Sequence, residues 1–194
     1  MSRPNGDERP DEDLLGLVGQ GDTTALRTLV FRHLPRLLGL AERLTGNAAD
    51  AEEIAQEALI RVWRAARTWK PGGARFATWL YRVTVNLCID RRRKRKPEPL
   101  DGLPDMPSAE MGALAEVQAG QMNALVRRLL DALPEKQRIA LVLSYYEELS
   151  SREVAEIMDT SPGAVMGLLF RGRQALKDRL TAAGIEGWDN EADT

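Results

Sequence analysis

Apolar positions recur along most of this chain at intervals of three and four residues, the spacing of an α-helix with one buried face. The clearest run is Ala51, Ile54, Ala55, Ala58, Leu59, Val62, Trp63 and Ala66. Strand-like alternation is absent, and β-branched residues are sparse. The pattern therefore predicts an all-α protein.

Several polar residues mark where these helices begin. Asn47 suits the N-cap of the clearest helix, and Ser150 with Glu153 has the spacing of a capping box. Ser161 is a good N-cap before Pro162, since proline is favoured at the first helical position. These signals predict a helix that begins near each of them.

The helical pattern stops at Pro97, where "PEPLDGLPDMPSAEMG" contains four prolines and two glycines. This composition is typical of a flexible linker. We therefore expect two small helical domains, 12–96 and 120–183, that a linker joins and that could close on each other or wrap a partner. The predicted segments are an acidic tail at 1–11, a domain at 12–96, the linker at 97–119, a domain at 120–183 and an acidic tail at 184–194.

Composition limits the chemistry. One cysteine, Cys88, and one histidine, His33, exclude an internal disulfide and argue against a zinc site. Cys88 is expected to pack in the core, and His33 is expected to lie at the surface or at the boundary of the core. Phosphate-binding glycine motifs are absent. We expect no catalytic residue, no metal and no cofactor, so the chain is not expected to be an enzyme.

The chain shows no signal of membrane insertion. No apolar run approaches the roughly 18 residues that a membrane span needs, and the first residues are polar and acidic. We therefore expect a cytoplasmic protein.

Positive charge is concentrated in one place. The net charge is -2, yet six consecutive cations run from Arg91 to Lys96, at the end of a predicted helix. Such a helix end attracts phosphates. Four aromatic residues precede it and could stack on unpaired bases: Trp69, Phe76, Trp79 and Tyr81. The alternatives are a solvated charge run and a packed aromatic cluster, and for Phe76 and Trp79 we favour the core.

The second domain contains a helix, a short turn and a second helix within "LSSREVAEIMDTSPGAVMGLLFRGRQALKDRL". Val154, Ile157 and Met158 are expected to face inward from the first helix. From the second, the inward positions are Val165, Leu168, Leu169, Leu176 and Leu180. A turn this short favours a helix-turn-helix, and a plain helical hairpin is the alternative.

Three segments occur in a familiar order: "DAEEIAQEALIRVWRA" (50–65), "FATWLYRVTVNLCIDRRRK" (76–94) and the long helical stretch 133–176. Over about 12–183 the chain strongly resembles the extracytoplasmic-function (ECF) sigma factors. The resemblance implies a region-two helical bundle and a region-four helix-turn-helix domain. It also implies a bacterial transcription initiation factor that binds core RNA polymerase, recognises promoter DNA and helps to melt the minus-ten element. An anti-sigma factor is a further implied partner.

The resemblance also assigns residues, position by position. Those implied to bind polymerase form one exposed helix face: Asp50, Glu53, Gln56, Glu57, Ile60, Arg61 and Arg64. Those implied to engage the minus-ten element are Lys70, Arg75, Phe76, Thr78, Trp79, Arg82, Asn86, Asp90, Arg91, Arg92, Arg93 and Lys94. Those implied to contact the minus-thirty-five element are Ser161, Gly163, Ala164, Phe170, Arg171, Arg173 and Lys177.

One segment departs from the family's pattern. Relatives usually carry polar or basic residues where this chain has Met166-Gly167-Leu168. Without those donors the minus-thirty-five contact is weaker or altered, or the apolar face meets a protein. The alternative function is therefore a sigma-like module that sequesters an anti-sigma factor without binding promoters. A helix-turn-helix repressor is a third possibility, but it leaves the 50–65 helix unexplained.

Overall fold

The structure, a computed structural model, describes residues 8–69, 75–95 and 125–182. Within these ranges the regular elements are all helices, which confirms the all-α prediction. The predicted linker, most of the acidic tails and Lys70 lie outside the described residues. None of the described helices is both long and apolar enough to cross a membrane.

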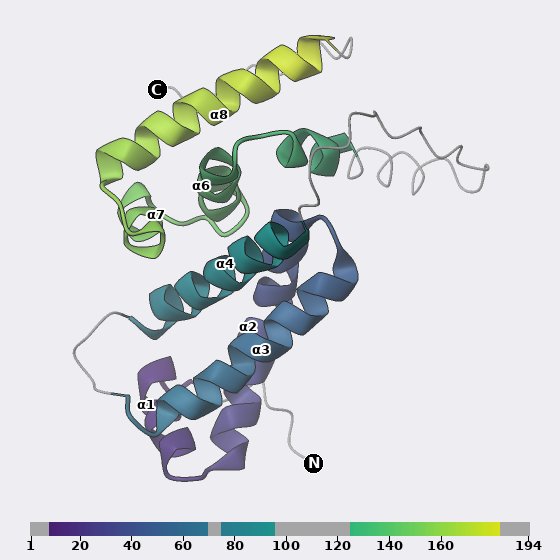
Figure 1. Ribbon diagram of the computed structural model, residues 1–194. Helices are drawn as coiled ribbons and strands as arrows, with labels where there is room; N and C mark the ends of the chain where they lie inside the picture. Colours follow the sequence, from purple (N-terminus) through teal and green to yellow (C-terminus); the bar gives the residue numbers. More distant parts are fainter. Residues whose placement is uncertain (1–7, 70–74, 96–124, 183–194) are drawn as a thin grey trace.

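Four helices make up the first group: α1 (Asp11–Gly19), α2 (Thr23–Thr45), α3 (Ala48–Ala66) and α4 (Phe76–Arg95) (Figure 1). Their shared core contains Leu14, Leu15, Val18, Ala25, Leu29, Leu37, Ala55, Ala58, Val62, Ala66, Phe76 and Leu80. The apolar spacing of the sequence explains this core, since each helix buries the face that carries these positions.

Local sequence explains where α2 ends and α3 begins. Gly46 adopts a left-handed conformation with φ of 70°, which glycine tolerates without a Cβ clash, and it terminates α2. Asn47 then accepts a hydrogen bond of 2.9 Å from the backbone N–H of Asp50. The predicted N-cap is therefore confirmed.

The second group begins with a helical stretch at 125–131 and continues with α6 (Glu135–Tyr145), α7 (Ser151–Met158) and α8 (Pro162–Ala182). Ser150 and Glu153 form the predicted capping box at the start of α7. Asp159, with φ of 52°, ends α7 and leads into the short turn before α8. The helix, turn and helix of the sequence prediction are therefore confirmed.

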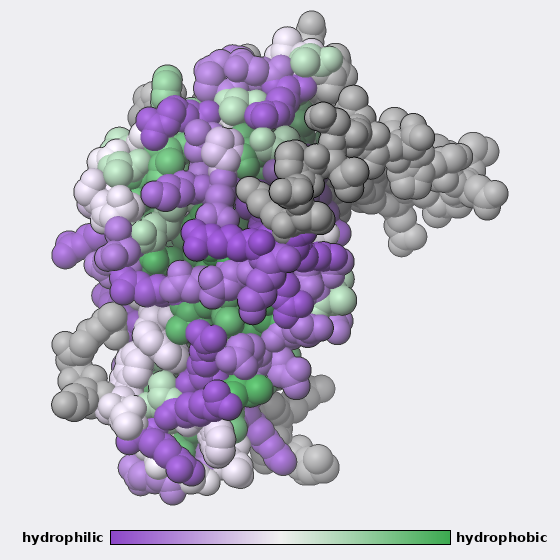
Figure 2. Space-filling model, viewed as in Figure 1, coloured by the Kyte–Doolittle hydropathy of each residue, from purple (hydrophilic) through white to green (hydrophobic). Residues whose placement is uncertain are grey.

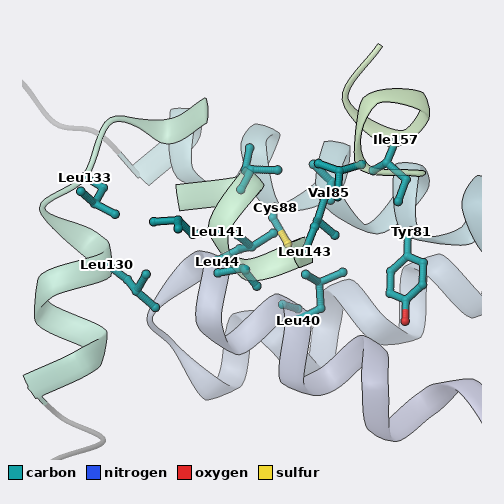
Figure 3. Close-up of a cluster of buried hydrophobic side chains, with 14 of the residues drawn as sticks. Leu40, Leu44, Tyr81, Val85, Cys88, Leu130, Leu133, Leu141, Leu143 and Ile157 are labelled. Atoms are coloured by element: carbon teal, nitrogen blue, oxygen red, sulfur yellow. The ribbon is translucent and has the colours of Figure 1, made fainter. Parts of the chain in front are cut away.

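The two groups share one hydrophobic cluster (Figure 3). The first group supplies Leu40, Leu44, Tyr81, Val85 and Cys88, and the second supplies Leu130, Leu133, Leu141, Leu143 and Ile157, among others. α4 packs against α7, and α2 packs against α6. α8 lies on the far side of α6 and α7 from the first group. The chain is thus closed, with its helix-turn-helix unit seated on α4.

Candidate nucleic-acid and protein interfaces

The side of α3 that faces away from the core carries most of the residues expected to bind polymerase. Five of them are exposed and Glu57 is half-buried: Glu53, Gln56, Glu57, Ile60, Arg61 and Arg64. Arg61 donates a hydrogen bond of 2.9 Å to Glu57 one turn away. Trp63 joins this face with 48% of its surface exposed, and Arg67 lies 5.4 Å from its ring centroid. The face therefore combines charges with a large aromatic side chain.

Asp50 was expected on that exposed face, and the structure corrects this. It is only 8% exposed, because the end of α4 crosses the first turn of α3 and covers it. Arg91 donates to its carboxylate at 3.0 Å, and Arg95 donates to the other oxygen. Asp50 thus serves as the internal anchor of α4.

The basic run at the end of α4 is divided between internal pairs and free charges. Arg91 also donates to Glu53 at 2.5 Å, and this bond raises the pKa of Arg91. Arg92 donates to Asp131 at 2.8 Å and to the Leu44 carbonyl at 3.2 Å. By contrast, Arg93 and Lys94 are exposed and have no ion-pair partner among the described residues. The available positive charge is therefore smaller than the sequence indicated.

The aromatic cluster at the start of α4 packs internally. Phe76 is fully buried and contacts the rings of His33, Trp69 and Trp79, with centroids 5.4 to 6.1 Å away. Its backbone N–H donates to Glu12 at 3.1 Å. The preference for a core role is confirmed for Phe76, whereas Trp79 is half-buried. Phe76 has no surface to offer a base in this arrangement.

Thr78, which the resemblance assigns to the minus-ten element, is buried. Arg75, Asn86 and Asp90 are exposed as expected.

Another part of α4 is covered by the second group. Tyr81 donates a hydrogen bond of 2.8 Å to Glu147, in the loop between α6 and α7. Arg82, although exposed, donates to the backbone carbonyl of Glu156 in α7. Arg82, which the resemblance assigns to the minus-ten element, thus contacts α7 instead, and its neighbour Tyr81 contacts the loop before α7.

Buried polar groups complete the contact between the two groups. Arg138 of α6 is 2% exposed, and burial lowers the pKa of its guanidinium. It lies with Cys88 and Leu44 around a narrow gap at the interface. Burial raises the pKa of the Cys88 thiol to about 12. The expectation that Cys88 packs in the core is confirmed, and the residue reports on closure because α6 covers it.

Two further contacts lie at the rim of this interface. Arg127 pairs with Glu42 of α2 at 2.6 Å. Arg43 of α2 lies 4.3 Å from the ring centroid of Tyr146. Arginine over an aromatic face is stabilised by the ring quadrupole, so the contact of Arg43 with Tyr146 favours the closed arrangement, and the exposed ion pair adds less.

α8 offers an outward surface. Its start is exposed at Ser161, Gly163 and Ala164, and the Ser161 hydroxyl accepts a hydrogen bond of 3.2 Å from Ala164. Phe170, Arg171 and Lys177 are also exposed, whereas Arg173 is half-buried and donates to the Tyr145 hydroxyl at 3.2 Å. Most predicted minus-thirty-five residues therefore share an accessible side of α8.

The opposite side of α8 packs closely on α6. A Cβ at Gly172 would stand 2.8 Å from Leu141, so glycine permits the close approach of the two helices. Val165 is fully buried, while the other four predicted inward residues of α8 are half-buried: Leu168, Leu169, Leu176 and Leu180.

Comparison with known protein families agrees with this arrangement. The family model for Sigma-70 region 2 matches residues 29–98, and the model for Sigma-70, region 4 matches residues 123–176. The chain is 34% identical to the ECF RNA polymerase sigma factor SigW of Bacillus subtilis over 84% of this chain and 92% of that protein. This chain belongs to the ECF sigma factors. It is therefore a sigma factor of transcription initiation.

Other relatives extend the comparison. This sigma factor is 35% identical to the ECF RNA polymerase sigma factor SigE of Mycolicibacterium smegmatis over 86% of its own length, and it spans 66% of that relative's length. Among solved structures, CnrH in complex with the cytosolic domain of CnrY matches with a TM-score of 0.70 and 25% identity, over 89% of this chain and 97% of that one. RpoE of Bartonella quintana, solved with the anti-sigma factor NepR, shares the fold with a TM-score of 0.60 and 22% identity. The match covers 80% of this chain and 96% of that chain.

Sequence reasoning missed two exposed apolar residues of this sigma factor. Periodicity placed Trp63 on the buried stripe of α3, although it lies at the edge of that stripe. Met166 was considered for the donors that it lacks and as part of an apolar face, but not together with Phe170. Met166 and Phe170 are four residues apart, on the side of α8 away from Val165. This spacing is the signal that could have placed the two side chains on one exposed face.

Proposed function

We propose that this sigma factor binds core RNA polymerase through the outer face of α3, brings it to promoter DNA, and helps to separate the strands at the minus-ten element through α4. The helix-turn-helix unit then contacts the minus-thirty-five element through α8. The function needs no bond to be broken, because contacts with the melted strand offset the cost of unpairing, a few kcal/mol per extruded base. Its place of action is the cytoplasm, where the polymerase works.

The observation that carries this proposal is the exposed positive charge at the end of α4. Arg93 and Lys94 are exposed and directly follow Arg91 and Arg92, which are held in internal pairs, and Arg91 pairs with the exposed Glu53 of α3. Exposed cations at a helix end attract phosphates. A polymerase held on α3 would therefore bring promoter phosphates close to these two cations.

Promoter binding through α4 requires the closed arrangement to open. Arg82 is held by the Glu156 carbonyl of α7, and Tyr81 by Glu147. A DNA strand and α7 cannot occupy this part of α4 together. We infer that polymerase binding separates the helix-turn-helix unit from α4, and that a partner of the anti-sigma class stabilises an inactive arrangement. The similar RpoE, solved with the anti-sigma factor NepR, supports such a partner.

The alternative function is a module that sequesters an anti-sigma factor without binding promoters. The apolar pair Met166 and Phe170 on α8, together with the covered surface of α4, favours it. The exposed cations Arg93 and Lys94, which have no ion-pair partner in the part of the chain that the structure describes, favour the initiation factor, because a protein partner of this kind does not require a phosphate-binding helix end.

Transcription with purified components tests the proposal. We expect the full chain with core polymerase to yield promoter-specific run-off transcripts from a pool of genomic promoters. A pool that yields none, from a chain that still binds an anti-sigma protein, would establish the sequestering module instead.

The polymerase face has its own test. Glu53→Ala combined with Gln56→Ala should reduce holoenzyme assembly, measured by gel filtration, while the helical circular dichroism is retained. Glu52→Ala is the matched control, because Glu52 is an exposed carboxylate of the same turn that lies outside the proposed contact. Full assembly of the double variant would contradict the assignment of this face.

A further inference from the structure

Two large apolar side chains lie next to each other on the outward face of α8. Met166 is 63% exposed and Phe170 is 65% exposed. They are four residues apart, so they occupy the same face of the helix one turn from each other. The opposite face of α8 packs on α6 and α7 through Val165 and Gly172. Within the described chain this pair therefore remains uncovered.

The residues around this apolar pair are cations and glycines. A Cβ added at Gly167 would stand 3.3 Å from Arg171, so the guanidinium lies across the helix beside the pair. A Cβ added at Gly163, one turn earlier, would have no neighbouring atom within 4 Å. The exposed cations of α8 are Arg171 and Lys177, whereas Arg173 donates to the Tyr145 hydroxyl and Arg179 to the Ala132 carbonyl.

This combination matches DNA better than a protein groove. Cations along the helix complement phosphates on both sides of the major groove, and small residues at the helix start allow the backbone to approach the base edges. In a helix-turn-helix unit, the first turns of the second helix contact those edges. The apolar group that the major groove presents is the 5-methyl of thymine.

We infer that Met166 and Phe170 read thymine methyl groups in the upstream promoter element, so that this sigma factor selects A·T pairs there by apolar contact. The inference rests on the proposed function and specifies the DNA that it selects. Neither side chain can donate to a guanine edge, so discrimination at these positions comes from shape and burial. Removal of one buried methyl group should lower affinity about fourfold.

The test replaces thymine with deoxyuridine, which lacks only that methyl. Holoenzyme formed from the full chain and core polymerase first selects duplexes from a randomised promoter library. In the enriched duplex, each upstream thymine is then changed singly to deoxyuridine, and affinity is measured. We expect affinity to fall about fourfold at one or more positions for the unaltered protein.

The variants assign each methyl to a side chain. Met166→Ala and Phe170→Ala should each become insensitive to deoxyuridine at one position and remain sensitive at another. Both side chains are exposed, so neither change should unfold α8, which circular dichroism verifies. Gln174→Ala is the control on the same helix and should keep the full deoxyuridine penalty.

Each contrary outcome has a distinct meaning. An enriched duplex that binds equally well with deoxyuridine at every upstream position would overturn the inference and leave the proposed function intact. Penalties that persist unchanged in both variants would also overturn it, because groups other than Met166 and Phe170 would then contact the methyls. A library with no enriched duplex would contradict the proposed function as well.

Discussion

The phenolic oxygen of Tyr81 donates a hydrogen bond of 2.8 Å to the carboxylate of Glu147, and this bond ties α4 to the loop between α6 and α7. The Tyr81 ring belongs to the hydrophobic cluster that the two helical groups share (Figure 3). Burial, together with the bond to Glu147, raises the pKa of Tyr81 well above its ordinary range. The closed arrangement thus combines apolar burial with specific polar contacts. Figure 2 shows that the surface outside these contacts is largely hydrophilic on the face viewed there.

The single cysteine should report on closure. Cys88 is buried under α6, and burial raises its pKa to about 12 from an ordinary value of 9.0. At neutral pH the thiolate fraction is therefore about a thousandfold smaller than for a free thiol. We expect very slow reaction with a maleimide, a rate that rises with pH, and clear acceleration when core polymerase binds. Free-thiol reactivity in the isolated protein would contradict the closed arrangement.

Tyr81→Phe should loosen the closed arrangement without damage to either helical group. The change removes the donor to a partly buried carboxylate, an interaction worth about 1.5 kcal/mol or more when the partner is charged. The Cys88 maleimide rate should therefore rise about tenfold, since about 1.4 kcal/mol is a tenfold change in an equilibrium.

Tyr145→Phe is the matched control for that experiment. Its hydroxyl contacts Arg173 within the second helical group and takes no part in the tie to α4. An equal acceleration in both tyrosine variants would mean that the hydrogen bond to Glu147 does not hold the two groups together.

The sequence alone predicted the structural features that depend on residues close together along the chain. The N-caps at Asn47 and Ser150 were predicted correctly, because their partners lie within three positions along the chain. The burial of Asp50 could not be predicted, because the arginines that cover it lie 41 and 45 positions away. The bond from Arg82 to Glu156 spans 74 positions, and only the closed tertiary arrangement brings the two together.

Asp50→Asn should destabilise the first helical group. The substitution removes the negative charge that two arginines share in a largely buried position, so the free energy of unfolding should fall by about 2 kcal/mol. Urea denaturation followed by circular dichroism measures this decrease. Glu53→Gln is the control, because its pair with Arg91 is exposed and should contribute less than about 1 kcal/mol. Similar decreases in both variants would refute a special anchoring role for Asp50.

Arg93 and Lys94 should contribute directly to promoter affinity, whereas Arg91 should act mainly through stability. Arg91 is held by Asp50 and Glu53, but the other two have no ion-pair partner among the described residues. Arg93→Ala and Lys94→Ala should each reduce the slope of log affinity against log salt by about 1 for every phosphate that the side chain neutralises, because fewer counterions are released. Promoter binding by holoenzyme at several salt concentrations gives that slope. The contrary result is a slope that Arg91→Ala flattens and that Arg93→Ala and Lys94→Ala leave unchanged. In that case polymerase binding must free Arg91 from Asp50 and Glu53, and the arginines that are paired in this structure would be the ones that contact DNA.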